Sequence, residues 1–292
     1  HLSPKAKLAD GTTASVLAWI WAHTVTCPNP ACGIQMPLAR SFWLSKKAVR
    51  KRAVRYEVKR PKGKPPYVEF EIFGPKTDNE IPSGTVNRAK ATCLCCGTVL
   101  APERVRAQLT AQRGGADVIF DEQGKRTGGA RLLAIVTLKQ SESGRFYRLP
   151  TAHDYEAIWK ARKRLDKTAA KPLPNGLSPV PDEPTPAGGG SGAGRAFSVQ
   201  KYGMMTFGDL FTVRQKLAVA CITRFIAEAE SIAVREVAGL ALSGVVDRNA
   251  VLATWRPQAD QEKVEHVFTR QALPMTWDFA EAVPLSSSTG SL

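Results

Sequence analysis

Apolar and polar residues alternate in short runs over the first hundred positions of the chain, which is the pattern of β-strands. The apolar run from Val16 to Val25 predicts a strand that leads directly into Cys27. Residues 54–59 and 67–73 alternate between polar and apolar side chains, and the stretch between them is rich in Pro, Lys and Gly. We therefore predict a β-hairpin with its turn in that stretch.

The hydrophobic spacing then changes and becomes typical of mixed structure. A helix is predicted at residues 102–112, because its first residue is a proline, which suits the first turn of a helix. The apolar centre of residues 131–139 predicts another strand. Thr151 and Asp154 form a capping-box pattern, which predicts a helix to about Leu165.

Two further helices are predicted in the last third of the chain. Thr212 with Gln215 three residues later is another capping-box pattern. The apolar residues that suit one face of this helix are Leu217, Val219, Ala220, Ile222, Phe225 and Ile226. Residues 232–246 predict a second helix. The fold class that these patterns favour is α+β.

Four regions follow from these patterns. Residues 1–101 are β-rich, 102–170 form a mixed α/β segment, and 197–292 form a helical segment. Residues 171–196 are dense in Pro and then Gly, so they bury too little apolar surface to offset their ordering entropy, and we predict a linker. The glycine run 188–190 invites comparison with a loop that holds S-adenosylmethionine, but it lacks the flanking strand and helix of such a loop.

The composition narrows the choice of partner. The formal net charge is +15 over 292 residues, which favours a polyanionic partner such as nucleic acid. The alternative is a soluble basic protein without a specific partner. No apolar run approaches the ~20 residues that a membrane helix needs, and no secretory signal is visible. We expect a cytoplasmic protein without membrane contact.

Two pairs of cysteines carry the clearest chemical signal. Four residues separate Cys27 from Cys32, and two separate Cys93 from Cys96. Thiolates at such spacings can wrap one side of a zinc ion, and four of them complete its tetrahedron. In a chain without an export signal, this pattern favours metal over disulfides. We predict one structural zinc ion bound by these four residues, in a zinc ribbon with the basic hairpin as an insertion.

The residues around the cysteines refine this prediction. Gly33 and Gly97 each follow the second cysteine of a pair, where positive φ lets the chain turn toward the sulfur atoms. Cys95 is left out because Cys93 and Cys96 have the better spacing. Cys221 lies on an apolar helix and is expected in the core, and His23 is expected to be a non-ligand. Unliganded cysteines and a disulfide remain as alternatives.

A strongly basic segment lies between the two cysteine pairs. Residues 40–64 contain eleven cations and a single acid, Glu57, with aromatic residues among them. Cations contact phosphates, and aromatic rings can stack on bases. The residues expected to contact DNA are Arg40, Lys46, Lys47, Arg50, Lys51, Arg52, Arg55 and Lys59. The alternative is a solvated charged face.

Several strings of the chain resemble one known family. The sequence Trp-Ile-Trp-Ala-His-Thr-Val-Thr-Cys-Pro-Asn-Pro-Ala-Cys-Gly stands at 19–33 and Thr-Trp-Asp-Phe-Ala-Glu at 276–281; the remaining strings are residues 37–47, 91–97, 202–204, 209–215 and 268–275. Together they resemble the adenine-specific DNA methylases that contain a zinc ribbon. The resemblance implies methyl transfer from S-adenosylmethionine to the exocyclic amine of adenine in DNA. It also implies that this material is inserted in a Rossmann-like methyltransferase core.

The chain departs from that family at the catalytic motif. Such enzymes need Asp-Pro-Pro-Tyr or Asn-Pro-Pro-Tyr, where the polar side chain accepts a hydrogen bond from the adenine amine and the aromatic ring stacks on the flipped base. Here Pro-Pro-Tyr occurs once, at 65–67, after Lys64, which cannot accept a hydrogen bond. We therefore expect an internal fragment that depends on the remainder of the methyltransferase chain. By itself it should bind no S-adenosylmethionine and have no catalytic residues.

Three classes of function remain open. The first is the zinc-ribbon and DNA-handling part of a DNA adenine methyltransferase. The second is a non-enzymatic zinc ribbon that binds nucleic acid, and the third is a structural scaffold. The flanking reading frame discriminates between the first two, because only a methyltransferase needs a cofactor loop and an Asp-Pro-Pro-Tyr motif.

Overall fold

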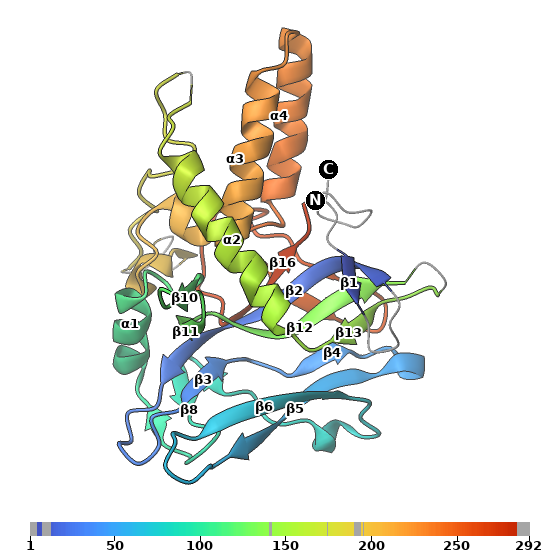
Figure 1. The fold of residues 1–292 in the computed structure, drawn as a ribbon, viewed down its shortest axis with the longest axis vertical. Coiled ribbons are helices and arrows are strands. Elements are labelled where there is room, and N and C mark those ends of the chain that lie inside the picture. Colours follow the sequence, from blue (N-terminus) through green and yellow to red (C-terminus); the bar gives the residue numbers. More distant parts are fainter. Residues whose placement is uncertain are drawn as a thin grey trace.

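The long strand β2 (Thr13–Thr26) organises a mixed α+β fold (Figure 1). The computed structural model describes residues 5–7, 13–139, 142–173, 175–189, 194 and 196–284. All positions of β2 from Val16 to Val25 are buried, so both faces of the strand are covered. This accounts for a continuous apolar run in place of an alternating one.

An antiparallel sheet forms around β2. Trp21 of β2 lies opposite Leu132 of one neighbouring strand and Phe279 of another, so strands from the middle and the far end of the described chain flank it. The other strands of this sheet are β1 (Lys5–Lys7), β3 (Gln35–Leu38), β12 (Arg131–Leu138), β13 (Phe146–Arg148) and β16 (Asp278–Ala282).

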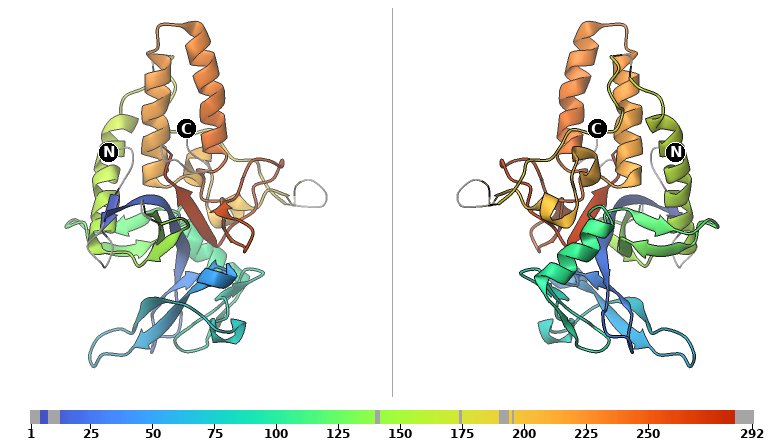
Figure 2. Two further views of the ribbon diagram at one scale, coloured as in Figure 1. Left: turned by 90° about the vertical axis from the view of Figure 1, so that its right-hand side faces the viewer. Right: turned by 90° about the vertical axis from the view of Figure 1, so that its left-hand side faces the viewer.

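Helices gather near one face of this sheet. Ile158 packs in the same apolar cluster as Trp19 and Trp21. The helices are α1 (Pro102–Ala111), α2 (Ala152–Ala169), α3 (Val213–Ala227) and α4 (Ile232–Val246), with short 3-10 turns at Ala48–Arg50, Asp78–Glu80, Val199–Tyr202 and Phe207–Leu210. The hairpin of α3 and α4 projects away from the sheet (Figure 2). None of the helices in the described part of the chain is long and apolar enough to cross a membrane.

Smaller sheets pack around the central sheet. On the face of β2 opposite Trp19 and Trp21, Ile20 packs with Leu44 and Val54 in a second apolar cluster, whereas Val118 lies in the first cluster with Trp21. The smaller sheets consist of β4 (Trp43–Ser45), β5 (Arg52–Lys59) and β6 (Tyr67–Phe73); β7 (Val86–Asn87), β8 (Lys90–Thr92) and β9 (Val99–Leu100); β10 (Val118–Phe120) and β11 (Arg126–Gly129); and β14 (Trp255–Pro257) and β15 (Glu262–Val264).

The elements predicted from local sequence patterns are present, but residues 197–292, predicted as a helical segment, also contain the strands β14, β15 and β16. The predicted hairpin is present as β5 and β6, and the helix predicted at 232–246 has those bounds. The capping boxes at Thr151 and Thr212 both form. Helix α2 continues four residues beyond the predicted end at Leu165, because no proline or glycine follows to stop it before Ala169.

The segment predicted as a linker connects α2 to the first turn of the C-terminal region. Its described residues include the buried Thr185, whose hydroxyl donates to the carbonyl oxygen of Met204 at 2.8 Å. Residues 190–193 and 195, which include the last glycine of the run 188–190, lie outside the described residues. The Thr185 hydrogen bond ties the segment to the residues that follow the 3-10 turn at Val199–Tyr202.

Candidate metal centre

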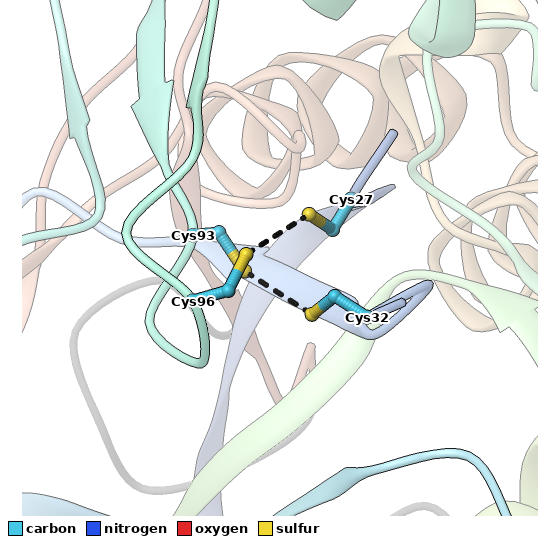
Figure 3. Close-up of side chains that lie close together, drawn as sticks. All are labelled: Cys27, Cys32, Cys93 and Cys96. Carbon is cyan, nitrogen blue, oxygen red and sulfur yellow. Dashed lines mark hydrogen bonds between the residues drawn. The ribbon is translucent and has the colours of Figure 1, made fainter. Parts of the chain in front are cut away.

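The fold brings the two cysteine pairs together from separate turns. Cys27 directly follows β2, and Cys32 lies in the turn before β3. Cys93 and Cys96 lie in the turn between β8 and β9. The four sulfur atoms all lie within 4.8 Å of one another, and the side chains converge on a common point (Figure 3).

The distances between the sulfur atoms match a tetrahedral site. The Sγ atoms of Cys27 and Cys96 are 3.6 Å apart, and those of Cys32 and Cys93 are 3.8 Å apart. A tetrahedron with Zn–S bonds of about 2.3 Å has edges of about 3.8 Å. A disulfide would need about 2.05 Å, and all four cysteines are free. The cluster could therefore hold a metal ion such as zinc.

Main-chain N–H groups support the four sulfur atoms in a repeated way. A donor lies two residues beyond each cysteine, in the pairs Asn29 to Cys27, Ile34 to Cys32, Cys95 to Cys93 and Thr98 to Cys96, and Cys93 also accepts from the N–H of Cys96. These hydrogen bonds lower the thiol pKa values. The turns need Gly33 and Gly97, whose φ angles of 56° and 74° lie in the left-handed region. The predicted role of these glycines is confirmed.

Burial opposes ionisation at three of the four sulfur atoms. It raises the pKa of Cys27 to about 12 and also raises the pKa values of Cys32 and Cys93. The exposed Cys96 differs, because the hydroxyl and N–H of Thr98 lower its pKa to about 6. The buried thiols therefore need a nearby positive charge before they lose their protons, and a divalent cation bound among them would supply it.

The other candidate ligands lie outside the four-sulfur group. Cys95 and Cys221 are both half-buried. The carbonyl oxygen of Cys95 accepts a hydrogen bond from Arg60 at 2.7 Å. His23 is fully buried against Phe279, with ring centroids 5.1 Å apart, and desolvation lowers its pKa to about 4 despite small opposing effects of the Gly114 and Gly115 backbone.

In the folded chain, nearby acids offset part of the positive charge of the basic segment. Strand β6 places acids opposite the cations of β5. Arg55 forms two hydrogen bonds to Glu71, and Lys59 lies 2.6 Å from Glu57 and 3.8 Å from Glu69. This face of the hairpin therefore carries balanced charge, which a count restricted to residues 40–64 does not show.

The remaining cations of the segment are spread over several neighbours. Arg40, Lys47 and Lys51 pair with acids, which are Asp278, Glu262 and Asp78 in that order. Lys46 and Arg50 lie over aromatic rings, which are Trp43 and Phe146, and Arg52 donates to the carbonyl of Lys51. The eight cations expected to contact DNA therefore do not form one continuous unpaired face.

A cluster around Glu281, which the sequence analysis does not predict, joins three of the strings that resemble the methylase family. The buried carboxylate of Glu281 accepts from the indole of Trp21 at 2.7 Å and from Arg214 at 2.7 and 2.8 Å. The guanidinium of Arg214 lies 3.7 Å from the ring centroid of Trp19. These residues come from 19–33, 209–215 and 276–281, so segments far apart in sequence meet at one place.

The Pro-Pro-Tyr sequence and the glycine run, the two motifs compared with those of methyltransferases, lie in a hairpin turn and in irregular backbone. Pro65 and Pro66 lie in the turn of the β5–β6 hairpin, and Tyr67 begins β6. Gly188 and Gly189 lie in irregular backbone, and none of the described residues directly before or after them belongs to a strand or an α-helix.

The chain matches no protein-family model, and it has no significant match among curated proteins or solved structures.

Proposed function

We propose that the four cysteines bind one zinc ion in a structural zinc ribbon. The observation that carries this proposal is the spacing of the sulfur atoms, since 3.6 and 3.8 Å agree with the edges of a zinc–thiolate tetrahedron. Four thiolates fill the coordination shell. A zinc ion held in this way stabilises the fold and has no open position for a substrate.

Metal analysis of the purified chain tests this proposal. We expect about one zinc per chain, and we expect Cys93→Ser to lose it. Cys95→Ser is the matched control, because it changes a neighbouring cysteine outside the four-sulfur group and should retain the metal. If the Cys95 variant loses the metal and the Cys93 variant keeps it, the ligand assignment is wrong.

We further propose that this zinc ribbon and its basic surroundings belong to an S-adenosylmethionine-dependent DNA adenine-N6 methyltransferase. The resemblance of these strings and the net charge of +15 support this assignment. Side chains from three of the strings meet at Glu281, so these strings share one core although they are far apart in sequence. A shared core would explain why all three resemble the same family, which also supports the assignment. The Rossmann-like core, the cofactor loop and the catalytic tetrapeptide would be supplied by the remainder of the methyltransferase chain.

Methyl transfer in the full reading frame tests the second proposal. The complete protein should transfer a labelled methyl group from S-adenosylmethionine to the N6 amine of adenine in DNA. The 292-residue chain alone should transfer none, because Pro65-Pro66-Tyr67 follows Lys64 and no other Pro-Pro-Tyr is present. DNA binding without methyl transfer by the complete protein would favour the non-enzymatic nucleic-acid-binding module. Methyl transfer by this chain alone would contradict the proposal that the remainder of the methyltransferase supplies the cofactor loop and the catalytic tetrapeptide.

A further inference from the structure

A cavity of about 280 Å³ opens between the segment before β4, strand β14 and the start of β16. Its floor is apolar and belongs to the core cluster around Ile20, with contributions from Phe42, Leu44, Val54, Leu133 and Trp255. Its rim is polar and includes Arg40, Ser41, Trp43, Lys46, Gln258 and Asp278. An apolar floor with a few polar groups at the rim is typical of a small-ligand site.

Hydrogen bonds from three elements fix the walls of this cavity. The carbonyl of Phe42 accepts from the N–H of Val54 at 2.8 Å, and the carbonyl of Pro257 accepts from the N–H of Lys46 at 2.7 Å. The indole of Trp255 donates to the carbonyl of Leu44 at 2.8 Å. Strands β4, β5 and β14 therefore hold the cavity in shape without a ligand.

Asp278 provides an acceptor at the rim. Its Oδ1 atom accepts from the N–H of Arg40 at 2.9 Å and lies 3.5 Å from Nε of the same residue. No described residue donates a hydrogen bond to its Oδ2 atom, although the side chain is only 20% exposed. Burial raises the pKa of this carboxyl, while Arg40 lowers it. A carboxylate oxygen in this position can accept a hydrogen bond from an amino group.

The rim also supplies positive charge and an aromatic wall. Lys46 lies 5.4 Å from the ring centroid of Trp43, and Arg40 has a side chain that is 55% exposed. Both cations belong to the basic segment, and unlike Arg55 and Lys59 they line a cavity. Aromatic walls bind base rings, and cations at the rim contact the adjoining phosphates.

We propose that this cavity binds an unpaired amino-bearing nucleobase, cytosine or adenine, of a nucleic-acid strand. Oδ2 of Asp278 accepts from the exocyclic amine, the ring lies on the apolar floor beside Trp43, and Arg40 and Lys46 face the phosphates. The base must be unpaired, because in a duplex the ring is stacked between its neighbours and cannot enter a cavity. The inference rests on the nucleic-acid contact of the proposed function and assigns a base-reading role within it.

A matched pair of ligands tests the role of Asp278. Cytosine and thymine differ at C4, where one has an amine and the other a carbonyl oxygen. The full zinc-loaded chain should bind labelled oligodeoxycytidine about tenfold more tightly than oligothymidine, as expected for one hydrogen bond to a charged group. The same order should hold for cytidine and uridine monophosphates, which report on the cavity without a strand.

Asp278→Asn provides the decisive variant. Its amide oxygen can still accept from the N–H of Arg40, while its NH₂ group would point at the base. The preference should therefore reverse toward thymine and uridine monophosphate, an outcome that misfolding cannot produce. Asp260→Asn is the control, because Asp260 is an exposed carboxylate paired with Arg256 and lies outside the cavity lining. It should leave the preference unchanged.

The outcomes separate this inference from the proposed function. Salt-dependent strand binding without a cytosine preference, unaffected by Asp278→Asn, would overturn the base pocket and leave DNA contact standing. If cytidine monophosphate binds and Asp278→Asn reverses the preference, but no strand binds, the pocket is supported and the DNA contact is overturned. Absence of binding by every probe would overturn both.

Discussion

Gly33 and Gly97 show how single residues determine the geometry of the candidate metal centre. Both lie at positive φ, yet a Cβ atom at either position would meet nothing within 4 Å. Their importance is therefore conformational and not steric, because L-residues resist the left-handed region.

Gly33→Ala should lower the free energy of unfolding by about 1 kcal/mol. Gly239→Ala is the matched control, because Gly239 lies in the exposed helix α4 with open space around it, and alanine there should stabilise by about 0.5–1 kcal/mol. Denaturant unfolding of both variants with zinc present measures the difference. Changes of the same sign would contradict the conformational explanation.

His23 gives the stability a pH dependence. Its pKa is about 4 in the folded protein and about 6.5 when exposed, so the unfolded chain binds the proton first as the pH falls. The stability contributed by the neutral His23 should therefore be full above about pH 6.5 and decline between about 6.5 and 4, by at most about 3.4 kcal/mol.

The variant His23→Leu should remove this part of the pH dependence. Zinc release at acidic pH affects the parent chain and the variant alike, so the difference between their unfolding curves isolates the histidine. A difference that stays constant from pH 7.5 to 4.5 would show that the imidazole does not titrate in this way.

At the scale of elements, one ion pair joins α3 to the sheet. Glu281 of β16 has a side chain that is 2% exposed, and Arg214 of α3 is 16% exposed. Removing one partner of such a pair leaves an uncompensated buried charge.

Arg214→Met should therefore destabilise the protein by about 3–5 kcal/mol. Adding Glu281→Gln should recover part of the loss, because the neutral amide has no charge to bury and its oxygen can still accept from the indole of Trp21. A double-mutant cycle from denaturant unfolding measures the coupling. Additive effects of the two substitutions would show that the ion pair contributes nothing to docking α3.

Local signals predicted the four α-helices and the strands β2, β5, β6 and β12, whereas the other strands and the pairings between distant elements lay beyond them. The hairpin of β5 and β6 follows from alternation around a Pro-rich turn, but its charge balance depends on register, which places Glu71 opposite Arg55. The cysteine pairs were found because their spacing is local. The pairing of β16 with β2 joins residues about 260 positions apart, and no periodicity within either strand specifies it.

The cavity at Asp278 could not be inferred for the same reason. Its lining comes from residues 20–54, from Leu133 and from residues 255–278, which are adjacent only after the sheet has formed. Arg40 and Lys46 were identified from the charge of their segment, whereas the carboxylate that faces them is more than 200 residues away.

At the scale of the whole molecule, the net charge of +15 should make DNA binding depend on salt. The logarithm of the binding constant should fall by about 0.9 per log unit of salt for each phosphate contact. Replacing Lys46, Lys47, Arg50 and Arg52 by Ala should weaken binding to all sequences alike and flatten this slope.

A variant that loses four positive charges elsewhere distinguishes a local effect of the basic segment from a general effect of net charge. The cations Lys160, Lys163, Arg164 and Lys167 lie on α2, far along the chain from the basic segment. Their replacement by Ala should leave the salt slope close to that of the parent chain. If both variants flatten the slope equally, the attraction is a general charge effect and the basic segment is a solvated face.

The central position of β2 also determines the order in which the protein can fold during synthesis. Its residues are synthesised before those of β16, so residues 18–22 gain this partner only when positions 278–282 have been made. Until then one edge of an apolar strand has exposed N–H and carbonyl groups that other chains can pair with. Both cysteine pairs are synthesised long before that point, so the two cysteine-bearing turns can come together first and shield the neighbouring end of β2 while the rest of the chain is still being translated.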